Sequence, residues 1–170
     1  SVIDVPIKIK DEDQLPDLQT KNCEIEFNNV NFKYKSTNEK AVNNINLKIE
    51  GGKITALVGQ SGAGKSTIIN LIPRFYDPQD GEITIDNQNT KKIRLKSLRK
   101  KISLVSQDVI LFDDTIKNNI SYADPKASEE NIHQACKFAA ADEFIEKLPK
   151  KYDTIVGENG IRPVSYTHLT

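Results

Sequence analysis

One glycine-rich segment, GQSGAGKST from Gly59 to Thr67, limits the possible folds of this chain more than any other stretch. It fits the phosphate-loop pattern G-x-x-x-x-G-K-[S/T] at every position. The apolar run KITALVG before it predicts a strand buried on both faces, and KSTIINLI after it carries apolar residues on one helical face. Because a strand, a glycine loop and a helix in this order form a phosphate site, we expect a bound nucleotide; the alternative is a plain turn.

The residue types of this loop suit a phosphate ligand. Glycines let the backbone turn tightly and aim N–H groups at phosphate oxygens, and the start of the helix adds the positive end of its dipole. Lys65 would neutralise the terminal phosphates, and the Ser66 hydroxyl would ligate Mg²⁺. Since the GTPase motifs D-x-x-G and N-K-x-D do not occur, the sequence favours an adenine nucleotide. The predicted nucleotide-binding residues are Gly59, Gln60, Ser61, Gly62, Ala63, Gly64, Lys65, Ser66 and Thr67.

The periodicity outside the loop predicts an α/β domain that begins with antiparallel strands. Strands are expected in EIEFNNVNFKY, with a kink at Asn28-Asn29, and in INLKI, EITID and ISLVS. Helices are expected in LKSLRKK and in SEENIHQACKFAAADEFIEKL, which begins at the N-cap Ser128 and breaks near Ala140.

Composition limits the kinds of partner that we expect for this chain. Basic and acidic residues balance at 24 each, so the net charge favours no polyanionic partner. The basic stretch from Lys91 to Lys101 is interpreted as a solvated face, and contact with anionic lipid headgroups or a partner is the alternative. It has no interleaved aromatic residues, which argues against nucleic-acid binding. The chain contains no methionine, and we expect it to be cut from a longer protein.

Together these stretches resemble the ATP-binding cassette, the nucleotide-binding domain of ABC transporters. IEFNNVNFKY and AVNNINLKIEGGKITALVG are similar to the opening β-subdomain of the family, and LVSQD resembles its Q-loop. RFYDPQDGEITID and TIVGENG are similar to the branch of lipid and multidrug exporters, in which transmembrane helices are fused ahead of the cassette. The resemblance covers about residues 22–162.

The resemblance implies an incomplete α/β fold: a P-loop NTPase (RecA-like) core with an N-terminal antiparallel β-subdomain and part of a helical subdomain. It divides the chain into a linker that follows a missing transmembrane domain (1–22), a partial nucleotide-binding domain (23–162) and a tail (163–170). We expect the linker, with its prolines and acidic run, to lie outside the core. The tail PVSYTHLT is interpreted as non-native sequence.

Family roles carry over to two further residues. Tyr34 matches the aromatic residue that stacks on adenine; an ordinary packed strand tyrosine is the alternative. Gln107 matches the catalytic Q-loop glutamine that reaches the Mg²⁺ and the attacking water; a polar loop residue is the alternative. The resemblance thus implies ATP and Mg²⁺ as cofactors, with Ser66 and Gln107 as metal contacts.

The resemblance also implies partner surfaces. Phe112 and the stretch Arg74-Phe75-Tyr76 resemble the surface that receives the coupling helices of the membrane domain. The loop Gly157–Gly160 resembles one that communicates this contact, and simple loop packing is the alternative for all three. The implied partners are the transmembrane domain of the same polypeptide and a second ABC domain in a head-to-tail dimer, at the cytoplasmic face of a membrane. Nucleic acid is not an expected partner.

The catalytic acids for ATP hydrolysis are not expected in this chain. VILFDD follows ISLVS too closely for a parallel Walker B strand, and Asp113-Asp114-Thr115 predicts an N-cap for TIKNNI. Asp86 has no base beside it, and the family's signature LSGGQ, Walker B acids and switch histidine do not appear after VGENG. We expect the parent to hydrolyse ATP to drive transport and this chain to bind ATP without hydrolysing it. The alternatives are a soluble ABC ATPase without a membrane domain and an inert nucleotide-binding remnant.

Overall fold

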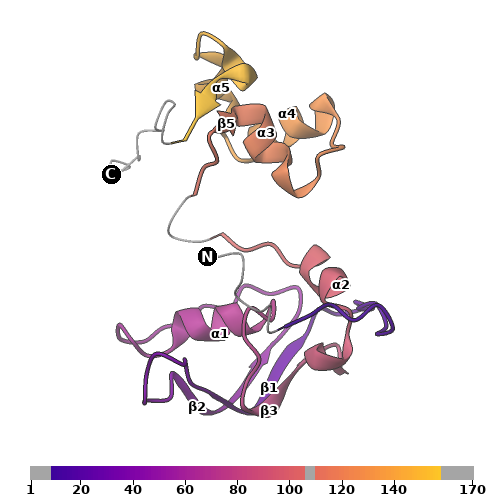
Figure 1. Cartoon of the computed structure of the whole chain (residues 1–170), viewed down its shortest axis with the longest axis vertical. Helices are drawn as coiled ribbons and strands as arrows, with labels where there is room; N and C mark the ends of the chain where they lie inside the picture. The colour runs from indigo at the N-terminus through magenta and orange to yellow at the C-terminus, as the bar shows by residue number, and fades with distance from the viewer. Residues whose placement is uncertain (1–8, 106–109, 158–170) are drawn as a thin grey trace. The chain divides into compact units, whose positions relative to one another are not determined.

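The computed structural model describes residues 9–105 and 110–157 of the chain. The chain forms two compact units, Ser1–Leu104 and Val105–Thr170, and each is described by itself (Figure 1). Among the described residues, the first unit contains a four-stranded sheet with two α-helices, and the second contains three short α-helices and a two-stranded pairing.

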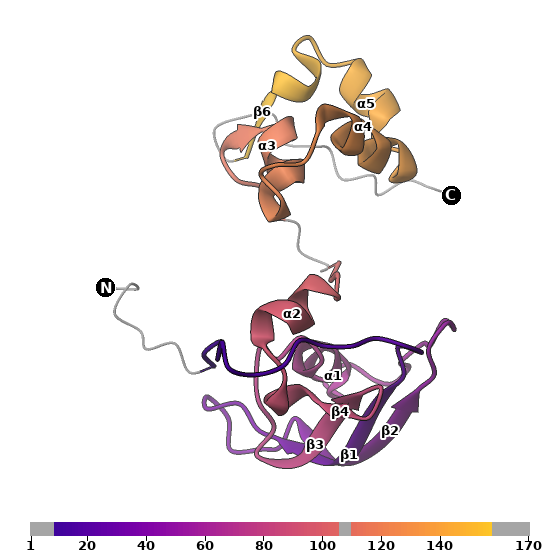
Figure 2. The same ribbon diagram turned by 90° about the vertical axis from the view of Figure 1, so that its right-hand side faces the viewer.

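The sheet of the first unit is antiparallel throughout. Its strands are β1 (Ile25–Phe32), β2 (Val42–Ile49), β3 (Asp80–Ile85) and β4 (Gln88–Asn89), in the order β2-β1-β3-β4 (Figure 2). In the central strand β1, Ile25 lies opposite Ile49 on one side and Ile85 on the other. The expected antiparallel β-subdomain is therefore confirmed.

A bulge in β1 keeps its apolar side chains on one face. The pairing register shifts between Phe27 and Val30, and Asn29 has a positive φ of 50°. Without this extra residue, strict alternation after Phe27 would turn Val30 to the opposite face. The predicted kink at Asn28-Asn29 is confirmed.

Helix α1 (Lys65–Leu71) covers that face of the sheet (Figure 2). Ile68 and Leu71 of the helix pack against a core from three strands that comprises Phe27, Val30, Phe32, Val42 and Ile83. Burying a side chain of this size contributes about 1.5–3 kcal/mol. This packing fixes the helix that follows the phosphate loop against the sheet.

A second core cluster lies around helix α2 (Leu95–Lys100), which follows the 3-10 helix η2 (Thr90–Lys92). It consists of Leu18, Ile85, Ile93, Leu95 and Leu98. Leu18 is only 4% exposed, so the expectation that residues 1–22 lie outside the core is wrong at this position.

The segment around Leu18 is also held by polar contacts. The Asp11 carboxylate accepts hydrogen bonds from the backbone N–H groups of Leu95 (2.6 Å) and Lys96 (3.1 Å), which caps α2 from a distant part of the chain. The Asp86 carboxylate accepts hydrogen bonds from the four consecutive N–H groups of residues 21–24. These contacts lower the pKa of Asp86, with the bond from Lys21 as the largest cause.

Two strands predicted from apolar runs do not form. Residues 53–58 form no strand and pair with no described segment, with Ile54 fully exposed and Val58 90% exposed. Residues 102–105, the described part of ISLVS, are likewise unpaired, and Val105 is exposed. Each run contributes one partly buried residue to a core cluster, Leu57 to that of α1 and Ile102 to that of α2. A strand that is buried on both faces also needs neighbouring strands, and the described residues supply none to these runs.

The second unit is built from short elements. Helix α3 (Ile116–Ile120) leads into η3 (Ser121–Ala123), followed by α4 (Glu129–Phe138), α5 (Asp142–Glu146) and η4 (Lys151–Asp153). Strands β5 (Asp114–Thr115) and β6 (Ile155–Val156) pair antiparallel. A small core joins these elements and contains Ile116, Cys136, Ile145 and Val156.

The helix signals of this unit are confirmed. Ser128 caps α4 by accepting a hydrogen bond from the Asn131 N–H at 3.2 Å. Ala140, with a φ of 53°, separates α4 from α5 as expected. Among the residues that the structure describes, no helix has the length and apolar character to cross a membrane.

Candidate nucleotide-binding site

The phosphate loop occupies the turn before α1 and requires glycine at two positions. Gly62 (φ 81°) and Gly64 (φ 83°) adopt the left-handed conformation. A Cβ on Gly64 would lie 2.3 Å from the backbone oxygen of Ala41, just before β2. Lys65, which is a fixed position of the pattern, is the first residue of α1. The loop is thus packed against the β1–β2 connection as well as joined to α1.

Lys65 folds over its own loop. Its Nζ donates hydrogen bonds to the backbone oxygens of Gly59 (2.8 Å) and Gln60 (2.6 Å). An ammonium group has three donors, so two bonds to the loop leave one for an anion. The positive charge is therefore held at the loop, where a phosphate group would bind.

Ser66 and Thr67 point to different environments. Ser66 is exposed, and its hydroxyl makes no hydrogen bond to any residue in the described ranges. A free hydroxyl in the first turn of α1 fits the predicted role as an oxygen ligand of Mg²⁺, a cation that prefers oxygen donors. Thr67 is buried, and its hydroxyl shares a hydrogen bond of 3.0 Å with the hydroxyl of Tyr34.

Tyr34, just beyond β1, is brought to the loop by this hydrogen bond. Its ring is half-buried and meets the rings of Phe32 and Tyr76 at centroid distances of 4.8 Å and 5.2 Å, both nearly perpendicular. The structure thus joins Tyr34 to the phosphate loop through Thr67. Gln107, the other residue with a predicted role in the site, lies outside the described residues.

A hollow of about 310 Å³ lies beside the loop. Its walls do not include Tyr34 or Lys65, so it adjoins the site without defining it. It is lined by Lys40, Ala41, Val42, Asn43, Ile45, Gly62, Ala63 and Ile68. The sequence does not predict this contact between the β1–β2 connection and the loop. The contacting residues are about twenty positions apart, and no sequence motif links them.

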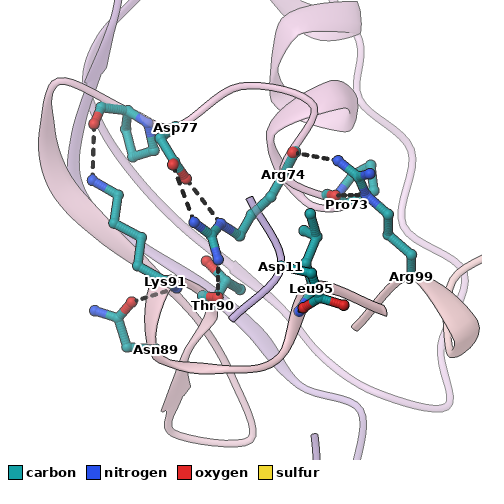
Figure 3. Close-up of polar contacts among 10 residues, drawn as sticks. Asp11, Pro73, Arg74, Asp77, Asn89, Thr90, Lys91, Leu95 and Arg99 are labelled. Carbon is teal, nitrogen blue, oxygen red and sulfur yellow. Dashed lines mark hydrogen bonds and ion pairs between the residues drawn. The ribbon is translucent and has the colours of Figure 1, made fainter. Parts of the chain in front are cut away.

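The sequence predicts that Arg74 belongs to an exposed partner surface, and this prediction is wrong. Arg74 is only 8% exposed, and its guanidinium donates to both carboxylate oxygens of Asp77 (2.9 Å and 3.1 Å) and to the Thr90 backbone oxygen (3.0 Å) (Figure 3). Arg99 donates to the backbone oxygens of Pro73 and Arg74 from the other side. Buried charge is tolerated only with such pairing, so Arg74 is a structural residue of the turn after α1.

The two aromatic residues that follow remain accessible. Phe75 is 45% exposed and Tyr76 41% exposed, and the Arg99 guanidinium lies 5.4 Å from the centre of the Phe75 ring. Arg94 and Lys91 of the same basic stretch also have partners, namely Asp17 and the Pro78 oxygen. The prediction of a solvated face is therefore incomplete. Arg99 and Lys91 of the basic stretch also hold the turn after α1 by hydrogen bonds to its backbone oxygens.

In the second unit, Phe112 is exposed and stacks on Tyr122 at a centroid distance of 4.4 Å. A groove of about 290 Å³ in the same unit is lined almost wholly by apolar side chains. Its lining residues are Leu111, Ile116, Asn119, Ile120, Ala141, Phe144, Ile145, Leu148 and Val156. Gly157 packs against the backbone of Asp113, whereas Glu158–Gly160 lie outside the described residues.

The acidic residues that sequence reasoning excluded from catalysis have structural roles. Asp86 holds the segment before β1, as described above. Asp114 pairs with Val156 in the short β5–β6 ladder, and the Thr115 side chain caps α3. The prediction of a helix cap in place of a Walker B strand is confirmed at Thr115.

Comparison with known proteins adds to this geometry. A family profile described as "ABC transporter" matches residues 42–165. The chain is 54% identical over 138 residues to an ATP-dependent lipid A-core flippase of Haemophilus influenzae, which covers 81% of this chain and 24% of the relative. It is 51% identical over 138 residues to ABC transporter B family member 21 of Arabidopsis thaliana, which covers 81% of this chain and 11% of that protein.

A solved structure agrees with the sequence relatives. A bacterial Atm1-family ABC exporter with ATP bound is similar at a TM-score of 0.84 and 40% identity, covering 92% of this chain and 27% of the exporter. The chain spans only 11–27% of the length of these three proteins. The family profile, the relatives and the α/β fold agree: this chain belongs to the ABC transporter family and has part of the fold of its ATP-binding domain.

Proposed function

We propose that this chain is the ATP-binding part of an exporter that couples ATP binding and hydrolysis to transport across a membrane. The observation that carries the proposal is the hydrogen bond between Tyr34 and Thr67, which joins the candidate adenine-stacking ring to the phosphate loop. Lys65 would then bind the terminal phosphates, and the loop N–H groups would hold the others. The similar Atm1-family exporter with ATP bound supports ATP as the ligand.

Mg²⁺ would be held by Ser66 in this site, with Gln107 as the second predicted contact. When bound, the ion would neutralise phosphate charge. Ser66 supplies an exposed hydroxyl for this purpose, and Lys65 keeps a separate positive charge beside it. The chain's own residues thus bind and orient the nucleotide, while hydrolysis is proposed to require the signature motif and acids of the parent protein.

Transport would require partners on two sides. We propose the transmembrane domain of the same polypeptide and a second ABC domain in a head-to-tail dimer, with the cassette at the cytoplasmic face of the membrane. Exposed Phe75 in the first unit and the apolar groove in the second are the surfaces that suit apolar segments of a membrane domain. The flippase and transporter names of the relatives favour this function over a soluble ATPase.

Nucleotide binding is tested by isothermal titration of the chain with ATP and Mg²⁺. Lys65→Ala removes the charge held over the loop, and we expect the Kd to rise at least about tenfold because a charge-assisted hydrogen bond is lost. Lys53→Ala is the matched control, since Lys53 pairs with Glu50 across the Gly51-Gly52 turn, away from the loop. Equal affinities of the two variants would contradict the assignment of the loop.

Hydrolysis is tested separately. We expect no release of phosphate from ATP by this chain above the level of Lys65→Ala, and steady turnover by the intact parent. Turnover by the chain that Lys65→Ala abolishes would show that it contains a complete catalytic centre. Absence of turnover in the parent would favour the inert remnant instead.

A further inference from the structure

Three aromatic rings form a cluster beside the phosphate loop. The ring centroids of Phe32 and Tyr34, of Tyr34 and Tyr76, and of Phe32 and Tyr76 are 4.8, 5.2 and 5.3 Å apart. Tyr34 meets both neighbours edge to face, at interplanar angles of 87° and 86°. Edge-to-face pairs favour one relative orientation of the rings, so both neighbours restrict the ring plane of Tyr34.

The hydroxyl of Tyr34 is fixed separately. It shares a hydrogen bond with Thr67, which is buried in α1. A single hydrogen bond at the tip of the side chain leaves rotation about the ring axis free. The contacts with Phe32 and Tyr76 are what restrain that rotation, and rotation decides where the flat face of the ring points.

Tyr76 differs from Phe32 in how it is held. Phe32 belongs to β1 and the core, whereas Tyr76 lies in the turn after α1. This turn is closed by hydrogen bonds from the Arg74 N–H to the Leu71 oxygen and from the Phe75 N–H to the Asn70 oxygen, with Arg74 at φ 53°. The ion pair between buried Arg74 and half-buried Asp77 locks the same turn (Figure 3).

We propose that Tyr76 is a positioning residue for adenine binding: it orients the ring of Tyr34 so that one face is presented to the base. This proposal rests on the proposed stacking of Tyr34 on adenine. Tyr76 itself need not touch the nucleotide. The turn around Arg74 holds Tyr76 in place. It therefore helps to shape the adenine site in addition to ending α1.

The test separates base recognition from phosphate recognition. The Kd values of ATP and of inorganic triphosphate are measured for the 170-residue chain by titration with Mg²⁺ present, and their ratio is compared among variants. Both ligands need the phosphate loop, so a loss of folded protein weakens both equally and leaves the ratio unchanged. Only a change in base stacking alters the ratio.

We expect Tyr34→Ala to reduce the preference for ATP over triphosphate about tenfold, and Tyr76→Ala to reduce it about three- to fivefold, since an edge-to-face contact is weaker than the stack itself. Tyr76→Phe should keep the original ratio, because the Tyr76 hydroxyl bonds to no described residue. Asp77→Asn should lower the ratio less than Tyr76→Ala. Tyr122→Ala, a change of the same type in the second unit, is the control and should leave the ratio unchanged.

The outcomes distinguish the inference from the function on which it rests. If Tyr34→Ala changes the ratio and Tyr76→Ala does not, the positioning role of Tyr76 is wrong. If Tyr76→Phe behaves like Tyr76→Ala, the ring contact is not the cause and the proposal also fails. If Tyr34→Ala leaves the ratio unchanged, or if the unmodified chain binds neither ligand, the proposed adenine site falls together with the inference.

Discussion

Strand β1 and residues 53–58 are both apolar runs with strand-forming residues, yet only β1 is paired and buried. Phe27 and Val30 of β1 are almost inaccessible to solvent, whereas Ile54 and Val58 are almost entirely exposed. The partners of β1 are antiparallel strands within the first unit, and β2 begins only ten residues after β1 ends. A parallel partner must arrive through a long crossover. Strand propensity therefore becomes structure only where the partner strand is supplied.

The largest difference in unfolding free energy is expected between the same substitution made in the paired sheet and in the unpaired residues 53–58. Ile83→Ala truncates a side chain in β3 that is 2% exposed, and we expect a loss of about 2–5 kcal/mol in the free energy of unfolding. Ile54→Ala makes the same change in the unpaired run and should cost less than about 0.5 kcal/mol. Urea unfolding monitored by circular dichroism measures both. A similar cost at the two positions would mean that residues 53–58 are buried in solution.

The phosphate loop tests this comparison at a single position. It directly follows the unpaired residues 53–58, yet Gly64 packs against Ala41 just before the start of β2. Gly64→Ala combines a positive φ with a contact against the Ala41 oxygen, and we expect a loss of about 2–3 kcal/mol in unfolding free energy. Gly52→Ala is the control, because Gly52 also has a positive φ (70°) but no neighbour within 4 Å. It should cost about 1 kcal/mol. Equal losses would show that the loop does not pack against the β1–β2 connection.

A smaller effect is expected where residues 9–24 stabilise the paired region. Asp11→Ala removes the acceptor for two N–H groups at the start of α2 and should cost about 1 kcal/mol of unfolding free energy. Asp11→Asn should restore only part of this, because its single amide oxygen replaces one of the two carboxylate oxygens that accept these bonds, and its NH2 group is a donor. The exposed Asp13, replaced by alanine, is the control in thermal unfolding. If Asp11→Ala and Asp13→Ala unfold alike, the cap does not form in solution.

The smallest effect is the pH dependence from Asp86. Its pKa is lowered in the folded protein, so its contribution to stability is present above the ordinary pKa of an aspartate, about 3.9, and is lost as the pH falls below that value toward the folded pKa. Asp86→Asn should therefore reduce the decline in unfolding midpoint between about pH 5 and pH 3. The exposed Asp80→Asn provides the reference. An unchanged decline in Asp86→Asn would contradict the four hydrogen bonds to this carboxylate.

Much of the fold could be predicted because its signals are local. The bulge at Asn29, the helix after the phosphate loop, the Ser128 cap and the break at Ala140 all follow from short patterns and are confirmed. The runs at 53–58 and 102–105 could not be judged in this way, since pairing depends on strands elsewhere. The acidic, proline-containing segment around Leu18 predicts exposure to solvent, and no local pattern marks Leu18 as the buried exception.

In the candidate site, too, local motifs could be predicted and contacts between distant residues could not. The glycine loop is a contiguous motif, so its conformation at Gly62 and Gly64 follows from the sequence. The role of Arg74 was misjudged, because only its distant partner Thr90 and the turn at Asp77 show that it is buried. The ring contact between Tyr34 and Tyr76 joins residues 34 and 76 with no shared pattern, and no sequence signal pointed to it.

The contacts of residues 11–24 have a mechanical consequence. Asp11 and Asp17 attach this segment to the start of α2, Gln19 exchanges hydrogen bonds with Gln88, and Asp86 binds residues 21–24. A pull along the segment would load these attachments together in shear, and a row of bonds loaded together yields less readily than bonds opened one after another. Force that enters through the chain ahead of β1 would therefore be transmitted to α2 and the sheet before the segment detaches.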